Sequence, residues 1–147
     1  MKILIDADGC PVVAETTTIA KEENIECIVI CDTSHIFNIE GIETITVSKG
    51  ENSVDFKLVN MLCVGDIVIT QDYALAAMCL SKKATVINQN GLIYNDDNIL
   101  SLLNQRHIAQ KIRRGGGRLR GAPPRNQSQN ESFISTLKKV IYEKKGL

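Results

Sequence analysis

The sequence has no tryptophan, only two histidines and no two cysteines in a CxxC arrangement. Its five cysteines form an odd set, and most of them lie within apolar runs, as reduced cysteines in a protein core do. We therefore expect neither disulfide bonds nor a structural zinc site. With only His35 and His107 present, general-base chemistry by histidine has little support, and we expect His107 to pack partly buried on a helix.

Long apolar runs are also missing. No stretch approaches the roughly 18 apolar residues that a membrane-spanning helix needs, and the first residues, MKILIDADG, are too short and too acidic for a signal peptide. We therefore expect a cytoplasmic protein without a membrane partner. The sequence gives no indication of an oligomeric state.

The length and composition are those of one folding unit. A chain of 147 residues fits a single domain (residues 1–147), because one hydrophobic core typically organises about 100 to 200 residues. Hydrophobic residues make up 44% of the chain and charged residues 23%, which is enough apolar surface to exclude a wholly disordered protein.

The formal net charge of zero conceals two oppositely charged parts. Residues 1–97 hold 6 Lys and Arg against 15 Asp and Glu, whereas residues 98–147 hold 11 against 2. No acid lies between Asp97 and Glu131, a stretch that contains seven Lys and Arg. Such segregation indicates that the two parts dock on each other or that an anionic ligand bridges them, unless the basic part is simply a solvated loop.

Short apolar runs alternate with helical patterns along most of the chain. We expect strands at residues 2–6, 26–31, 44–47, 66–70 and 84–88. We expect helices at about 11–23, 54–64 (capped by Ser53), 73–80, 131–144, and from a cap at Asn95 or Asp97 to about 112. This alternation predicts an α/β fold with a mostly parallel central sheet and helices on both faces. Glycines, prolines and amides predict a basic flexible loop over residues 113–130.

Aspartates follow two of the expected strands. Asp6 and Asp8 come at the end of the first strand, Asp72 follows the strand at 66–70, and Asp55 opens the helix before that strand. In an open parallel sheet these positions lie at one edge, where ligands bind outside the carboxyl ends of the strands. Converging carboxylates repel one another unless a cation neutralises them, and hard oxygen ligands favour Mg²⁺ or Mn²⁺. We therefore expect these four aspartates to bind such an ion, although any single one of them could instead cap a helix.

Asp66 is expected to play a different part. It stands at the start of the strand that Asp72 follows, and six residues of extended chain separate the two by roughly 20 Å. Because the two carboxylates cannot share one ion, we interpret Asp66 as a turn residue.

Arginines of the basic stretch are candidate nucleic-acid-binding residues. The expected phosphate contacts come from Arg113, Arg114, Arg118, Arg120 and Arg125. This stretch contains no aromatic residue, so base stacking is not expected to be its main mode of binding. An acidic metal site beside basic side chains favours a polyanion as partner, and single-stranded or structured RNA is the substrate class that we expect.

Four motifs extend over nearly the whole chain: IDADGCPV at 5–12, GDIVITQDYALA at 65–76, INQNG at 87–91 and RRGGGRLRGAPP at 113–124. Together they resemble the YaiI/YqxD family of bacterial proteins of unknown function, and the pairing of DADxCP with a later GDxVITxD is the most specific feature. That family is similar to PIN and NYN nucleases, whose acids after the first and fourth strands hold Mg²⁺ or Mn²⁺ for phosphodiester cleavage. The resemblance implies a PIN-like, Rossmann-like domain in which Asp6 and Asp72 are the catalytic acids.

The chain departs from the pattern of this family at two places. Ala74 stands where the family usually has proline, a change that affects the start of a helix. Gln129 and Asn130 stand where the family commonly has an acid before the final helix, which removes one further carboxylate.

Two other functions stay open beside a metal-dependent nuclease. One is a non-catalytic metal- or RNA-binding module of the same fold, which the missing acid near Gln129 favours. The other is a phosphatase of the haloacid dehalogenase type, because Asp6, Asp8 and Gly9 form a DxDG motif after the first strand. A phosphatase of that type needs a late acidic pair beyond one strand, whereas Asp66 and Asp72 bracket theirs, so we favour the nuclease.

Overall fold

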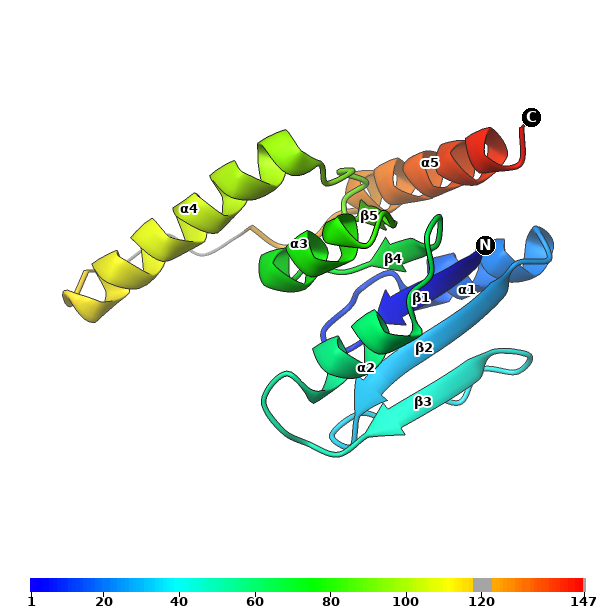
Figure 1. Cartoon of the computed structure of the whole chain (residues 1–147), viewed down its shortest axis with the longest axis horizontal. Helices are drawn as coiled ribbons and strands as arrows, with labels where there is room; N and C mark the ends of the chain where they lie inside the picture. The colour runs from blue at the N-terminus through cyan, green and yellow to red at the C-terminus, as the bar shows by residue number, and fades with distance from the viewer. Residues whose placement is uncertain (118–122, 147) are drawn as a thin grey trace.

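The computed structural model describes residues 1–117 and 123–146. Its centre is an all-parallel sheet of five strands in the order β3-β2-β1-β4-β5 (Figure 1). The strands are β1 (Lys2–Asp6), β2 (Glu26–Asp32), β3 (Glu43–Val47), β4 (Ile67–Ile69) and β5 (Thr85–Ile87). This order places the switch point beside β1, as in Rossmann-like folds. The predicted α/β class with a parallel sheet is confirmed.

Helices cover both faces of the sheet. One face carries α1 (Val13–Glu22) and α5 (Gln127–Lys144), and the other carries α2 (Ser53–Met61), α3 (Tyr73–Ser81) and the start of α4 (Asp96–Arg114). The rest of α4, which ends at Arg114 and which we call the α4 arm, extends away from the body, past the edge at which the strands end (Figure 1). None of the described helices is long and apolar enough to cross a membrane.

Alternating side chains in the strands build two cores, one under each layer of helices. In β1, Ile3 and Ile5 pack toward α1 and α5, while Leu4 packs toward α2 and α3. β2 follows the same alternation, with Cys27 and Cys31 in the first core. Because both faces of these strands are buried, each strand has a continuous apolar run in the sequence. The strands thus hold their carboxyl ends rigidly at one edge.

The start of α2 and the start of α5 differ from expectation. The predicted Ser53 cap is wrong, because α2 begins at Ser53 itself and Asn52, with a φ of 63°, takes the cap position without a side-chain hydrogen bond. α5 begins at Gln127 rather than near 131, since Asn126 and Gln129 form a reciprocal capping box. α4 also reaches Arg114. The expected loop over residues 113–130 is therefore shorter at both ends.

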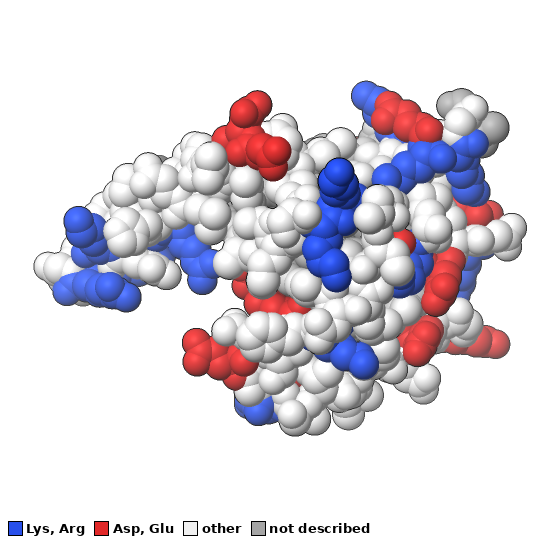
Figure 2. All heavy atoms as spheres, in the orientation of Figure 1, with Lys and Arg blue, Asp and Glu red and all other residues white. Residues whose placement is uncertain are grey.

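The oppositely charged parts of the chain contact each other. Lys145 Nζ, after α5, lies 3.3 Å from Glu23 Oε2, and Arg106 Nη1 of α4 lies 3.8 Å from Asp72 Oδ1. Both pairs are partly solvated and contribute little to stability. Lys and Arg side chains gather on the outer part of the α4 arm, while Asp and Glu side chains are visible in the hollow between this arm and the body (Figure 2).

Candidate metal centre and nucleic-acid interface

The carboxyl ends of β1 and β4 open into a pocket of about 470 Å³, which we call the acidic pocket. All four aspartates that the sequence predicts as metal ligands line it. Asp6 ends β1, Asp8 follows in the next turn, Asp72 precedes α3 and Asp55 lies in the first turn of α2. The topology therefore brings together residues that lie up to 66 positions apart in the sequence.

Asp6 is a largely buried acid. Its Oδ2 accepts a hydrogen bond of 2.7 Å from Thr70 Oγ1. Burial raises the pKa of Asp6 to about 6; the Thr70 hydrogen bond acts in the opposite direction, and the negative charges of Asp55, Asp72 and Asp8 raise the pKa further. A cation in the acidic pocket would therefore stabilise the ionised form of this carboxyl group.

Asp72 is also the N-cap of α3. Its Oδ1 accepts hydrogen bonds from the backbone N–H groups of Ala74 (2.9 Å) and Leu75 (3.1 Å), and its own N–H donates to Thr70 Oγ1 at 3.0 Å. The capping interpretation is thus correct for this residue, and Oδ2 accepts no hydrogen bond from the described residues. A proline at position 74 could not donate to Oδ1, so the alanine provides one additional contact that fixes the carboxylate.

The four carboxylates surround the acidic pocket loosely. Burial raises the pKa of Asp55, and the charge of Asp72 adds to this effect. Within residues 1–117 and 123–146, however, no three of the four predicted acids offer oxygen atoms within 4.8 Å of one another. An ion held by all of them would therefore need small side-chain movements or bridging water molecules.

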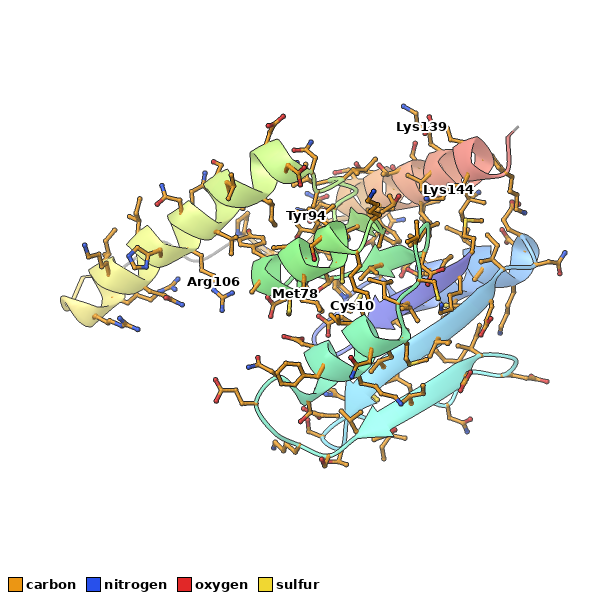
Figure 3. All side chains as sticks on the ribbon, in the orientation of Figure 1. Cys10, Met78, Tyr94, Arg106, Lys139 and Lys144 are labelled. Carbon is orange, nitrogen blue, oxygen red and sulfur yellow. The ribbon has the colours of Figure 1, made fainter. Side chains whose placement is uncertain are left out.

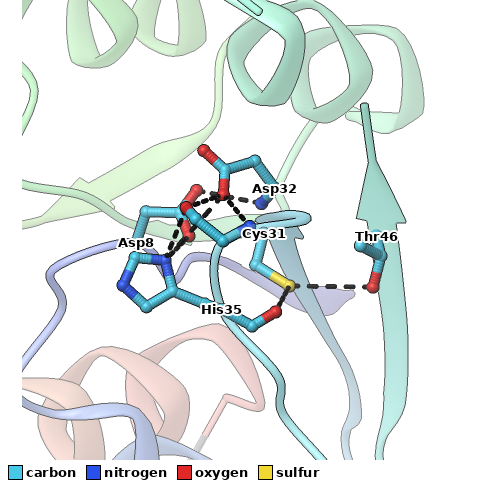
Figure 4. A network of polar contacts seen from close by, with 6 residues as sticks. Asp8, Cys31, Asp32, His35 and Thr46 are labelled. Atoms are coloured by element: carbon cyan, nitrogen blue, oxygen red, sulfur yellow. Dashed lines mark hydrogen bonds and ion pairs between the residues drawn. The ribbon is translucent and has the colours of Figure 1, made fainter. Parts of the chain in front are cut away.

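Asp8 turns toward a second group of ligand atoms next to the acidic pocket (Figure 4). Its Oδ1 lies 2.7 Å from His35 Nδ1, and its Oδ2 accepts a hydrogen bond of 3.0 Å from the backbone N–H of Asp32. Asp8, Asp32 and His35 offer ligand atoms that all lie within 4.8 Å of one another. Hydrogen bonds from Ser34 lower the pKa of Asp32 and keep it ionised.

Asp32 and His35 are not among the residues that the sequence predicts for the site. Asp32 ends β2, which finishes at the same edge as β1, so the positional rule that selects Asp6 also selects Asp32. His35 has no comparable signal, because only the loop after β2 brings it back toward Asp8. His107, expected to be partly buried, is exposed on α4.

Asp66 lies at the opposite end of β4, as predicted. It is only 2% exposed and accepts hydrogen bonds from Lys2 Nζ (2.6 Å), the Lys2 backbone N–H (3.1 Å) and the Cys63 backbone N–H (2.8 Å). Burial opposes ionisation, but these hydrogen bonds outweigh it and lower the pKa of Asp66. Asp66 is a structural residue and forms no acidic pair with Asp72, which weakens the phosphatase alternative.

The predicted phosphate-binding arginines differ in their surroundings. Arg113 and Arg114 lie exposed in the last turn of α4, with their side chains available to a ligand. Arg118 and Arg120 lie outside the described residues.

Arg125 has a structural role. Its Nη1 donates to Asn90 Oδ1 (2.6 Å), its Nη2 to the Gln89 carbonyl (2.5 Å) and its Nε to Asn130 Oδ1 (2.7 Å). These bonds fasten the start of α5 to the turn after β5, where Gly91 has a φ of 87° and lies too close to the α5 backbone for any side chain. Asn130, at the place of the missing acid, is thus an acceptor for Arg125.

The protein has a parallel α/β fold, and acids gather at the carboxyl edge of its sheet. These two features define a Rossmann-like protein with a candidate ligand site outside its strand ends. The chain belongs to the YaiI/YqxD family. A family model described as "Uncharacterized BCR, YaiI/YqxD family" matches residues 4–143. The resemblance that the motifs indicate is therefore confirmed.

Similar proteins cover the chain almost end to end. A "UPF0178 protein" of Exiguobacterium sibiricum is 46% identical over 98% of this chain and 99% of its own length. A "UPF0178 protein" of Ruminiclostridium cellulolyticum is 53% identical over 93% of this chain and 90% of its own length. One from Natranaerobius thermophilus is 42% identical, with 99% of each chain covered. No solved structure matches the chain.

Proposed function

We propose that this protein is a metal-dependent nuclease that acts on RNA, with Mg²⁺ or Mn²⁺ held in the acidic pocket by Asp6, Asp8, Asp55 and Asp72. The observation that carries the proposal is the gathering of these four carboxylates around one pocket at the carboxyl edge of the sheet. The resemblance that the motifs imply to PIN and NYN nucleases, with acids at corresponding strand ends, is a second line of support.

The donor set suits a hard divalent cation. Carboxylate oxygens are the ligands that such ions prefer. Asp6 has a pKa raised to about 6, and Asp8 Oδ1, a buried atom, lies 2.7 Å from His35 Nδ1. Both features fit a place where positive charge is needed. When bound, the ions would activate a water molecule and stabilise the leaving oxygen of a phosphodiester.

The chain fixes the two acids to which we assign the catalytic role. Thr70 holds Asp6, and the first turn of α3 holds Asp72. Side chains held by such supporting contacts need little reorganisation when ligand binds. No protein nucleophile is required, and Cys10 is a poor candidate because burial raises the pKa of its thiol to about 11.

Phosphate groups of the RNA would contact the basic end of the α4 arm. The exposed Arg113 and Arg114 provide positive charge there, and we assign the same role to Arg118 and Arg120. The arm extends beyond the edge where the acids gather, so a strand bound along it can reach the acidic pocket (Figures 1 and 2). Guanidinium groups suit this role because they bind phosphate oxygens in pairs.

A second candidate function is a binding module that holds metal or RNA without cleavage. The observation that favours it is the loose spacing of the four predicted acids, since no three of these described side chains come within 4.8 Å. The two functions share the fold and the surfaces and differ only in turnover.

The test is an RNA cleavage assay with Mg²⁺ and with Mn²⁺. The wild type should cleave a single-stranded RNA oligomer, and Asp72→Asn and Asp6→Asn should lose this activity while they retain RNA binding. Asp97→Asn, an exposed acid on α4, is the matched control and should cleave like the wild type. RNA bound but left intact by the wild type with both metals would favour the binding module. Turnover of a small aryl phosphate instead would favour the phosphatase.

A further inference from the structure

A second hollow adjoins the acidic pocket, on the side toward α4. It has a volume of about 340 Å³ and is lined by Gln71, Asp72, Tyr73 and Arg106. Gln71 and Asp72 also line the acidic pocket, so a ligand in one hollow directly adjoins a ligand in the other. Neither Tyr73 nor Arg106 is among the residues predicted from the sequence for binding, and we call this hollow the tyrosine pocket.

Arg106 brings positive charge to the tyrosine pocket. It lies in the middle of α4 and points off the helix toward the gap beside the start of α3 (Figure 3). Its Nη1 lies 3.8 Å from Asp72 Oδ1, and its side chain is 48% exposed. A pair at this distance in contact with solvent is weak, and the guanidinium makes no hydrogen bond to the described residues. Arg106 is therefore available to bind an anionic group such as a phosphate.

Tyr73 brings an aromatic ring to the same place. The ring is half-buried, packs against the core and meets the Tyr94 ring edge to face, with ring centroids 6.1 Å apart and planes inclined at 71°. Tyr94 is itself 2% exposed, and its hydroxyl donates to the Thr70 carbonyl at 3.3 Å. Tyr73 is therefore held in position by a fixed neighbour while part of it faces the pocket. A ring so placed can stack a nucleobase.

We propose that the tyrosine pocket binds one unstacked nucleotide of a single-stranded nucleic acid, with the base on Tyr73 and the phosphate on Arg106. The inference rests on the proposed function for its class of ligand, and it deepens that function by naming a preference for single strands. Because bases in a duplex are already stacked on each other, only a single strand or a loop can offer a base to Tyr73. The adjacent phosphodiester then lies at the acidic pocket.

The absence of tryptophan from the chain makes a direct test possible, because Tyr73→Trp introduces a unique fluorophore. With EDTA present, a single-stranded RNA oligomer should quench its fluorescence, and the same oligomer with abasic sites should not. Tyr142→Trp, on the exposed surface of α5, is the matched control and should not be quenched. Equal quenching by the abasic oligomer, or no binding of either, would overturn the proposal.

Affinity measurements on unlabelled variants provide the second readout. Tyr73→Leu should weaken binding of the single-stranded oligomer about 5- to 150-fold, the usual range for one stacked base, whereas Tyr73→Phe should bind like the wild type. Arg106→Ala should weaken binding and Arg106→Lys should restore part of it. A duplex of the same sequence should bind more weakly than the single strand and should not respond to Tyr73→Leu. Duplex binding that equals single-strand binding would contradict the proposal.

These measurements need no metal and no cleavage, so they separate the two proposals. Stacking without any RNA cleavage would leave the tyrosine pocket in place and refute the nuclease. Metal-dependent cleavage by a Tyr73→Leu protein with unchanged affinity would support the nuclease and refute the tyrosine pocket.

Discussion

Replacing Asp6 by asparagine should stabilise the metal-free protein at alkaline pH. The pKa of Asp6 is raised from 3.8 to about 6, so the folded protein holds this proton more tightly than the unfolded chain does. Stability is therefore lost as the pH rises between these two values, and at about 1.4 kcal/mol per pKa unit the loss amounts to roughly 3 kcal/mol. Asparagine carries no charge and can still accept the Thr70 hydrogen bond, so the variant should avoid most of this loss.

The assay is urea unfolding in EDTA at several pH values. The difference in free energy of unfolding between Asp6→Asn and the wild type should be near zero at about pH 4 and should rise to roughly 3 kcal/mol at about pH 8. Excess Mg²⁺ should stabilise the wild type more than the variant, since the variant lacks one ligand for the ion.

Two other aspartates serve as controls: Asp66→Asn should destabilise the protein, and Asp97→Asn should leave its stability nearly unchanged. Asp66→Asn should destabilise the protein by roughly 1–3 kcal/mol at neutral pH, because the carboxylate accepts three hydrogen bonds and its pKa is lowered. This cost should shrink as the pH falls below about 4, where the unfolded carboxyl group binds its proton. Asp97→Asn should change stability by less than about 0.5 kcal/mol. If Asp6→Asn is less stable than the wild type at pH 8 in EDTA, or differs equally at all pH values, the account of Asp6 is wrong.

Further predictions concern the metal, the arginines and the start of α3. Mn²⁺ affinity, measured by calorimetric titration, should fall as the pH drops through about 6, because protons compete for Asp6. Arg125→Ala should lower the free energy of unfolding by about 1–3 kcal/mol in denaturant titrations and leave the salt dependence of RNA affinity unchanged. Replacing Arg113 and Arg114 by alanine should leave the free energy of unfolding unchanged. It should flatten the slope of log RNA affinity against log salt concentration by roughly 1.4. Ala74→Pro should fold normally by circular dichroism, because the first turn of a helix tolerates proline.

The fold was predictable because its elements have strong local signals. Buried parallel strands such as Glu26–Asp32 show up as uninterrupted apolar runs, and each is followed by turn residues and a helical pattern. The start of α5 was not predictable to the same degree, since Ser128 and Asn130 have lower helix propensity than the residues that follow in the helix. Only the reciprocal capping bonds between Asn126 and Gln129 place the helix start there.

The candidate site was predictable where position along a strand determines it. Asp6 and Asp72 follow from the rule that parallel strands end at one edge, and the structure places both at that edge. His35 depends on the path of an irregular loop, and Arg106 depends on how far α4 extends over the acidic pocket. The sequence alone gives no distances between elements of this kind, so these residues emerge only from the structure.

Anomalous scattering from crystals soaked in Mn²⁺ would locate the bound ion without any assumption about activity. We expect a peak in the acidic pocket within coordination distance of Asp6 and Asp72, and this peak should disappear in crystals of Asp72→Asn. A peak confined to Asp8, Asp32 and His35, or no peak at the carboxyl edge of the sheet, would show that Asp6 and Asp72 do not hold the ion.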